Sequence, residues 1–362
     1  PPALLGCTGY RPAPSGVSAG DDPPISSCSR LCGSLFLKSA RTGLVCLWLA
    51  GALLSTEAHA AGARPDGTSG PRHPEARVTA VKSIDDRMID LTVRSPAMGT
   101  SIPVRVILPA SWSSEPKATF PVLYMFHGGD DDYTSWTRET DVEALAKNAD
   151  VLVVMPDAGK AGYYSDWFAG TPRWETFHTH ELVRLMEKEY RAAPSRAVVG
   201  LSMGGFGALN YAAHHRGMFR YVASMSSYVD LDDAAVRLEL SLGTWREGID
   251  IKDVWGDPEK NARVWRAHNP AAMPRAFRGT HVHLSAGSSE PGPLDEGRSP
   301  DAFLVSMLGE IHLSKQIESF EQSLRSAGVD VTTHLYKPGT HSWPYWRDEL
   351  HSIWPAVMKS LG

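Results

Sequence analysis

The residues whose types and spacing predict chemistry most strongly lie in the stretch 198–207, VVGLSMGGFG. Gly200-x-Ser202-x-Gly204 is the nucleophile-elbow pattern, in which a serine lies on a sharp turn between a strand and a helix. The positions two before and two after the serine must be small, because larger side chains would collide as the turn closes. Apolar residues precede the pattern and a helical run follows it. We therefore expect Ser202 to be a nucleophile, with N–H groups of a helix start facing the developing oxyanion.

A serine nucleophile needs a general base, which in folds with this elbow comes from a histidine late in the chain. His341 follows the last predicted strand, and the turn Pro338-Gly339 brings it to the carboxyl edge of the sheet, where Ser202 is expected. His341 is therefore the predicted base. His281 and His283 share a strand face, but no third ligand is near them, so the sequence predicts no metal site.

The carboxylate that orients the histidine is left open by the residues alone. It should follow the predicted strand 282–286, because the order along such chains is serine, acid, histidine. The first carboxylate past that strand is Glu290, and Glu310 lies before a helical segment. The full set of candidates is Glu290, Asp295, Glu296, Asp301 and Glu310.

Alternating strands and helices are expected to position these residues. Buried apolar runs and alternating patterns predict strands over 78–81, 88–93, 102–108, 120–126, 151–155, 197–199, 221–225, 282–286 and 329–335. Helical patterns lie at 141–148, after Thr171-Pro172, at 206–213, at 301–327 with a break near Gly309, and at 354–361. Residues 229–278 are predicted to be an irregular, Trp-rich insertion over the site, with weak helical signals. The fold class is therefore α/β, specifically an α/β-hydrolase fold with a mostly parallel sheet and antiparallel N-terminal strands.

The composition is that of a globular protein. The 362 residues are 42% hydrophobic and 21% charged with a formal net charge of −5, and no basic stripe suggests a nucleic-acid partner. Residues 1–60 are predicted to be a non-native extension followed by a secretory signal peptide: a basic segment at 38–41, an apolar run at 43–54 and the Ala-x-Ala site ending at Ala60. The apolar run is too short for a stable membrane span. All four cysteines precede Ala60, which excludes thiol chemistry from the mature chain.

We expect residues 61–77 to be a Gly/Pro-rich linker and residues 78–362 to be a single catalytic domain.

From about Val122 to Trp346 the chain resembles the antigen 85 mycolyltransferases and related secreted actinobacterial esterases. The resemblance is carried by five segments outside the elbow: 131–136 (DDYTSW), 154–156 (VMP), 164–167 (YSDW), 174–177 (WETF) and 339–346 (GTHSWPYW). The last segment is long and unusual, so the resemblance is specific. It implies an acid at a fixed distance before a helical Phe320, which is Glu310, with Glu290 as the alternative.

The resemblance also implies an oxyanion hole made by the N–H groups of Gly129 and Met203. The His127-Gly128-Gly129 sequence agrees, since glycine lets the backbone approach a substrate closely. Asp130 stands where the mycolyltransferases carry a sugar-binding arginine, and His127 replaces an aspartate.

The predicted function is a secreted serine esterase that hydrolyses small-molecule or lipid esters without a cofactor. The alternative is an acyltransferase that passes the acyl group to a sugar or another alcohol, and a third reading is a non-catalytic cell-wall or matrix-binding protein. The missing arginine favours the esterase. Tyr133, Trp136 and Trp343 are predicted to bind substrate, although packing of these aromatic rings is an equal alternative.

Overall fold

The computed structural model describes residues 75–297, 310 and 312–362. Within these residues one nine-stranded sheet has the order β1-β2-β3-β5-β4-β6-β7-β8-β9. The strands are β1 (Arg77–Ser83), β2 (Met88–Arg94), β3 (Ser101–Ile107), β4 (Phe120–Phe126), β5 (Leu152–Pro156), β6 (Ala192–Leu201), β7 (Tyr221–Met225), β8 (His281–Ala286) and β9 (Asp330–Leu335). The predicted signal peptide and most of the predicted linker lie outside the described residues.

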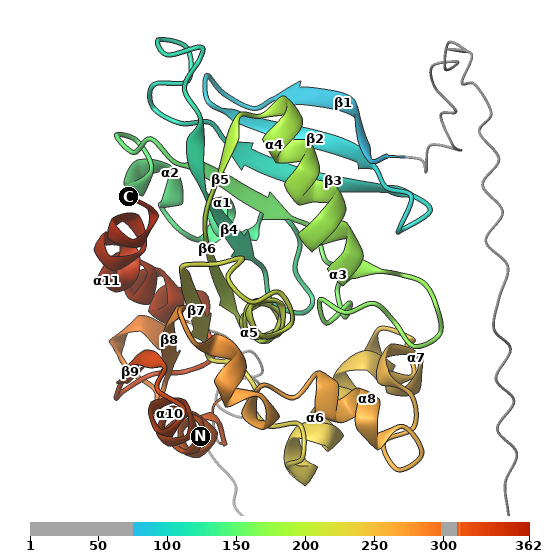
Figure 1. Ribbon diagram of the computed structural model, residues 1–362. Helices are drawn as coiled ribbons and strands as arrows, with labels where there is room; N and C mark the ends of the chain where they lie inside the picture. The colour runs from blue at the N-terminus through green and yellow to red at the C-terminus, as the bar shows by residue number, and fades with distance from the viewer. Residues whose placement is uncertain (1–74, 298–309, 311) are drawn as a thin grey trace, which may run out of the picture. The chain divides into compact units, whose positions relative to one another are not determined.

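The sheet is mixed, as the sequence predicts. β1, β2 and β3 pair antiparallel, β3 pairs antiparallel with β5, and the remaining pairs from β5 to β9 are parallel. Figure 1 shows β1 to β3 at one end of the sheet and β8 and β9 at the other. The α/β fold class and the antiparallel N-terminal strands are therefore confirmed.

Helices cover both faces of the sheet, because the central strands are apolar on both sides. In β4, Val122 and Phe126 belong to one core cluster, whereas Leu123 and Met125 belong to the other. This alternation follows from the two-residue period of a strand. The helices α1 (Ser135–Glu139), α2 (Val142–Leu145) and α11 (Trp343–Leu361) contribute to the second cluster, and α4 (Val183–Glu189), α5 (Met203–His214) and α10 (Leu313–Ser326) to the first.

The helical segment after Thr171-Pro172 contains a stretch of π-helix. It runs through α3 (Trp174–Thr176), the π-helix η1 (Phe177–Leu182) and α4. His178 is buried in this π-helix. Its Nδ1 lies at hydrogen-bond distance, 2.9 Å, from the Tyr211 hydroxyl, and its Nε2 lies 2.9 Å from the Asp157 carbonyl oxygen. Since Asp157 follows β5 and Tyr211 lies in α5, this histidine joins three elements beside the sheet.

The segment 229–278 is more helical than expected. It contains α6 (Ala234–Arg246), α7 (Ile251–Trp255), α8 (Ala262–Ala267) and the 3₁₀ turns η2 (Pro270–Ala272) and η3 (Pro274–Phe277). Asp233 caps α6 by accepting the N–H groups of Ala235 and Val236. Figure 1 shows α6, α7 and α8 grouped together beyond the sheet.

The closing helix that was predicted to contain residues 354–361 is confirmed. It is α11, which begins at Trp343 and has Pro344 in its first turn, where its missing N–H is tolerated. Of the predicted helix 301–327, the part from Leu313 to Ser326 is α10; the earlier part, with the acid candidate Asp301, lies outside the described residues. No helix in the described part of the chain is long and apolar enough to span a membrane.

Candidate active site

Ser202 lies on the turn between β6 and α5, at the carboxyl edge of the parallel strands. Its backbone has φ 51° and ψ −123°, a conformation that residues other than glycine rarely adopt. Neighbouring groups hold it: the Ser202 N–H donates to the Met225 carbonyl at 2.8 Å, and the Ser227 hydroxyl donates to the Ser202 carbonyl at 2.7 Å. Hydrogen bonds to β7 and to the loop after it thus hold Ser202 in this strained backbone conformation.

The two glycines of the elbow pattern are required by close backbone contacts. A Cβ atom on Gly200 would lie 2.2 Å from the Gly204 carbonyl oxygen, and a Cβ atom on Gly204 would lie 2.3 Å from the Phe126 carbonyl oxygen. Both distances are far inside van der Waals contact. The residue types predicted from the turn geometry therefore have a direct steric cause.

The structure brings His341 and Glu310 to the serine. His341 Nε2 lies 3.0 Å from Ser202 Oγ, and His341 Nδ1 lies 3.3 Å from Glu310 Oε1. The Glu310 side chain is fully buried. The His341 and Trp346 rings meet edge to face, with centroids 4.9 Å apart and planes at 89°. Ser202, His341 and Glu310 thus form the nucleophile–base–carboxylate geometry expected for acyl transfer.

The alternative acid, Glu290, faces another partner. Its carboxylate ion-pairs with Lys337 Nζ at 2.5 Å, and its backbone carbonyl accepts the Gly339 N–H at 2.8 Å. Both Glu290 and Lys337 are largely exposed. The geometry favours Glu310 as the group that orients His341.

The loop after β4 passes next to the elbow. A Cβ atom on Gly128 would lie 2.9 Å from Leu201 Cδ1 and 3.5 Å from Ser202 Cβ. Met203 is the first residue of α5, so its N–H has no partner inside the helix. Among the described residues, neither the Gly129 nor the Met203 N–H donates a hydrogen bond, which leaves both able to bind an oxyanion.

His127 holds this loop in place. Its ring is 1% exposed; Nδ1 lies 2.7 Å from the Gly128 carbonyl, and Nε2 accepts the Ala158 N–H at 2.9 Å. The Tyr164 hydroxyl donates to the His127 carbonyl at 3.0 Å. Burial lowers the pKa of His127, which favours the neutral ring with its proton on Nδ1. The sequence singled out His127-Gly-Gly, but not the link from His127 to the loop after β5.

The three predicted substrate-binding aromatics differ in exposure. Trp136 is 1% exposed and belongs to the core, where its ring meets the Trp343 ring edge-on at 5.3 Å. It therefore packs α1 against α11 and offers no surface to a substrate. Tyr133 and Trp343 are half-buried. The guanidinium of Arg105 lies 5.7 Å from the Tyr133 ring.

Acidic side chains lie beside the proposed oxyanion loop. Asp130 has φ 59°, and its N–H donates to the Lys160 carbonyl at 3.0 Å. Lys160 Nζ lies 3.9 Å from Glu247, the residue that follows α6. A hydrogen bond to Asp130 raises the pKa of Glu247. The segment 229–278 therefore reaches the loop that follows β4.

Four other histidines in the described part of the chain have structural partners. His214 and His215, at the end of α5, both form hydrogen bonds with the Glu175 carboxylate. Burial alone would raise the pKa of Glu175, but these hydrogen bonds lower the pKa to about 2. His283 bonds Glu349 at 2.6 Å, and His281 lies 2.8 Å from Asp330. Among the described residues, no group of three or more His, Cys, Asp or Glu is placed to hold a metal ion.

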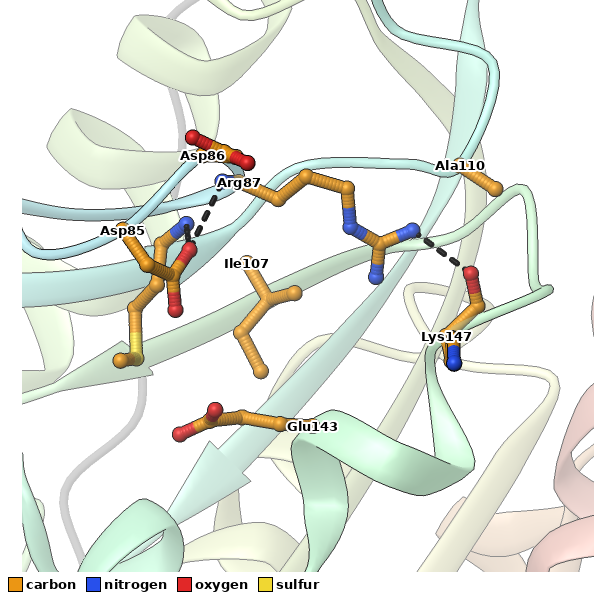
Figure 2. A pocket seen from close by; sticks show the side chains of 8 residues that line it. Asp85, Asp86, Arg87, Ile107, Ala110, Glu143 and Lys147 are labelled. Carbon is orange, nitrogen blue, oxygen red and sulfur yellow. Dashed lines mark hydrogen bonds between the residues drawn. The ribbon is translucent and has the colours of Figure 1, made fainter.

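A surface cavity of about 430 Å³ is separate from these residues. Figure 2 shows the side chains that line it. It lies by the turn between β1 and β2, and its polar groups pair with one another: Asp85 accepts the N–H groups of Arg87 and Met88, and Arg87 donates to the Lys147 carbonyl. None of the predicted site residues lines this cavity.

Comparison with known proteins identifies the family of this chain. Residues 95–357 match the model of the family described as "Putative esterase". Mycolyltransferase Ag85B of Mycolicibacterium smegmatis, named a diacylglycerol acyltransferase/mycolyltransferase, is 30% identical over 288 residues, which cover 75% of this chain and 85% of that protein. This chain belongs to the antigen 85/mycolyltransferase-like esterase family. The resemblance predicted from its motifs is confirmed.

The family includes proteins named as esterases as well as transferases. "Esterase MT1326" of Mycobacterium tuberculosis is 31% identical over 271 residues, which cover 71% of this chain and 56% of that protein. The crystal structure of M. tuberculosis MPT51 (FbpC1) superposes with a TM-score of 0.63 at 23% identity, covering 75% of this chain and 98% of that one. A Staphylococcus aureus fluorophosphonate-binding serine hydrolase, FphF, gives 0.58 at 18% identity, covering 76% and 98%. These structures support the α/β-hydrolase fold.

Proposed function

We propose that this member of the esterase family is a serine esterase that cleaves carboxylic esters through an acyl-serine intermediate. The observation that carries the proposal is the 3.0 Å distance between Ser202 Oγ and His341 Nε2, with Glu310 on the other ring nitrogen. A hydroxyl at hydrogen-bond distance from a histidine that a buried carboxylate orients is an activated nucleophile.

In the acylation step, Ser202 Oγ attacks the ester carbonyl carbon and its proton passes to His341 Nε2. The carbonyl electron pair moves to oxygen, where the N–H groups of Gly129 and Met203 stabilise the negative charge. The tetrahedral intermediate collapses, the bond to the alkoxy oxygen breaks, and His341 returns the proton to the leaving alcohol.

In the deacylation step, His341 takes a proton from water, whose oxygen attacks the acyl-serine. The second intermediate collapses, the bond between the acyl carbon and Ser202 Oγ breaks, and His341 returns the proton to Oγ, which releases the carboxylic acid and restores Ser202. Throughout the cycle, the Glu310 carboxylate accepts a hydrogen bond from the Nδ1–H group of His341 and stabilises the imidazolium that forms. Apart from the ester and water, these steps use only side chains and backbone groups of the chain.

Tyr133 and Trp343 are the proposed substrate-binding aromatics, because both rings are half-exposed near the proposed oxyanion and histidine loops. Lipid esters are the proposed substrate class. Support comes from relatives about 30% identical that carry the name diacylglycerol acyltransferase/mycolyltransferase.

Transfer to an alcohol is the second candidate, and the names of the same relatives favour it. Asp130 and Glu247 favour hydrolysis, because these carboxylic side chains lie beside the loop where mycolyltransferases carry a sugar-binding arginine. Incubating the enzyme with a p-nitrophenyl ester, with and without a sugar acceptor, separates the two. Free carboxylic acid as the main product in both reactions supports the esterase; an acylated sugar as the main product supports the transferase.

A non-catalytic, cell-wall or matrix-binding role is the third candidate. A fluorophosphonate reacts only with an activated serine, so it tests this role directly. Covalent labelling of the peptide that contains Ser202 supports an enzyme, whereas an unlabelled, folded protein supports the binding role.

We also propose that the protein is secreted and that residues 78–362 form its catalytic domain, on the basis of the predicted signal peptide and linker. N-terminal sequencing of the protein from the culture medium of an expressing actinobacterium tests this. A start at Ala61 supports it, and retention of the full chain in the cells contradicts it.

A further inference from the structure

A buried carboxylate other than Glu310 lies against the loop that carries His341. Asp295 is 7% exposed and ends the short 3₁₀ turn η4 (Pro293–Asp295) after β8. Its Oδ1 accepts the Thr340 hydroxyl at 2.6 Å, and its Oδ2 accepts the Tyr345 hydroxyl at 2.8 Å and the Gly292 N–H at 2.9 Å. Hydrogen bonds to a buried carboxylate are among the stronger ones in proteins.

The partners of Asp295 flank His341 in the chain. Thr340 precedes the histidine and is fully buried, and its Oγ1 also lies 3.1 Å from the hydroxyl of Ser342, which follows the histidine. Tyr345 lies in the first turn of α11. Asp295 therefore accepts hydrogen bonds from side chains on both sides of His341 in the chain, whereas Glu310 contacts the His341 ring.

The two loops meet closely at a second place. A Cβ atom on Gly287 would lie 2.5 Å from the Gly339 carbonyl oxygen, and the Gly339 N–H donates to the Glu290 carbonyl at 2.8 Å. The loop after β8 thus supports the His341 loop from residue 339 through residue 345. Such support matters because a displacement of about 1 Å in a catalytic group can lower a rate about 100-fold.

We propose that Asp295 is a positioning residue that orients His341 toward Ser202 through Thr340 and Tyr345. This inference rests on the proposed function, since it assigns a role in the same proton transfer. Its signature is a loss of kcat with little change in KM, because His341 acts on the reacting atoms rather than on substrate affinity.

Thr340→Val tests the link with the smallest change in shape, since it replaces a hydroxyl by a methyl group. Thr280→Val is the matched control: Thr280 is 4% exposed, donates one hydrogen bond to the Phe219 carbonyl at 2.9 Å, and precedes β8 at the opposite edge of the sheet. Thr340→Ser keeps the hydroxyl and serves as the conservative variant. Each full-length variant is measured for its melting temperature and for kcat and KM on a p-nitrophenyl ester.

We expect Thr340→Val and Asp295→Asn to lower kcat by about 10- to 100-fold, with KM within about 3-fold of the wild type. Thr340→Ser should retain most of the activity, and Thr280→Val should lower the melting temperature but leave kcat unchanged. The double variant Asp295→Asn/Thr340→Val should lose less than the product of the single losses, because both changes break the same hydrogen bond.

Two results would overturn the role of Asp295 without contradicting the proposed function. In both cases, an inactive Ser202→Ala variant would show that the proposed function still holds. One is a kcat within 2-fold of the wild type in folded Thr340→Val. The other is a combination of two observations: Asp295→Asn lowers kcat as much as His341→Ala does, and Glu310→Gln remains active. That combination would make Asp295 the acid itself. A fully active Ser202→Ala would instead contradict the proposed function. If Asp295→Asn fails to fold, Thr340→Val and Thr340→Ser still decide.

Discussion

His341 Nε2 lies 3.0 Å from Ser202 Oγ, although 139 positions separate the two residues in the chain. The parallel strands β6 and β9 place their carboxyl ends at one edge of the sheet, which explains the approach. The two residues therefore come together through sheet topology rather than local sequence.

Glu310→Gln should lower kcat by about 100- to 10,000-fold, because the amide cannot stabilise the imidazolium and disturbs the tautomer of His341. Glu290→Gln is the matched control and should change kcat by less than 3-fold, since this carboxylate pairs with exposed Lys337. Steady-state kinetics on a p-nitrophenyl ester measures both. The reverse ranking of the two variants would identify Glu290 as the acid.

Gly204→Ala should destabilise the protein by about 3 kcal/mol or more, because the new Cβ would lie 2.3 Å from the Phe126 carbonyl oxygen. Gly129→Ala is sterically mild by comparison, as the nearest atom would be 3.4 Å away. Urea unfolding followed by circular dichroism gives the free energy of unfolding of each. Equal stability of Gly204→Ala and the wild type would mean that the elbow is more open than the structure has it.

His127→Phe keeps a ring but removes the bonds to the Gly128 carbonyl and the Ala158 N–H. We expect kcat to fall about 10- to 100-fold, because the Gly129 N–H would no longer be held toward the oxyanion. His281→Phe makes the same change at the amino end of β8 and should leave kcat unchanged. An unchanged kcat in a folded His127→Phe variant would show that this ring does not position the loop.

The stability of the protein should fall with acidity through His178. Burial lowers the pKa of His178 to about 3, below the unfolded value of about 6.5. The unfolded state therefore binds a proton first, and stability is lost as the pH falls from about 6.5 toward 3.

Comparing the wild type with His178→Gln isolates this effect from other titrating groups. Between pH 7.5 and pH 5.0 the wild type should lose about 2 kcal/mol more unfolding free energy than the variant. Urea unfolding at the two pH values provides the difference. An equal loss in both proteins would mean that His178 is not neutral and buried in the folded state.

The sequence was informative where the determining contacts are local. The elbow needs small residues within two positions of Ser202, so its pattern is visible in a short window. His341 lies in an unusual segment after a Pro-Gly turn, and the spacing to Phe320 in the family pattern led to Glu310. The near-continuous apolar run of β4 likewise predicts burial on both faces.

Features that depend on distant partners were not predictable. Nothing in the segment 131–136 indicates that Trp136 packs against Trp343 of α11. The apolar pattern of α6 is weak, because Leu238 and Leu242 are exposed. The segment 229–278 was therefore expected to be irregular. The contact of Asp295 with Thr340 likewise joins loops that are 45 positions apart.

The central claim is that Ser202 is the nucleophile, and kcat/KM of Ser202→Ala on a p-nitrophenyl ester tests it most directly. Ser195→Ala is the matched control, because Ser195 lies in the same strand, with its hydroxyl donating to the Leu361 carbonyl. We predict that folded Ser202→Ala loses activity by a factor of about 10⁴ or more, whereas Ser195→Ala stays within 2-fold of the wild type. A Ser202→Ala variant with wild-type kcat/KM would contradict the account.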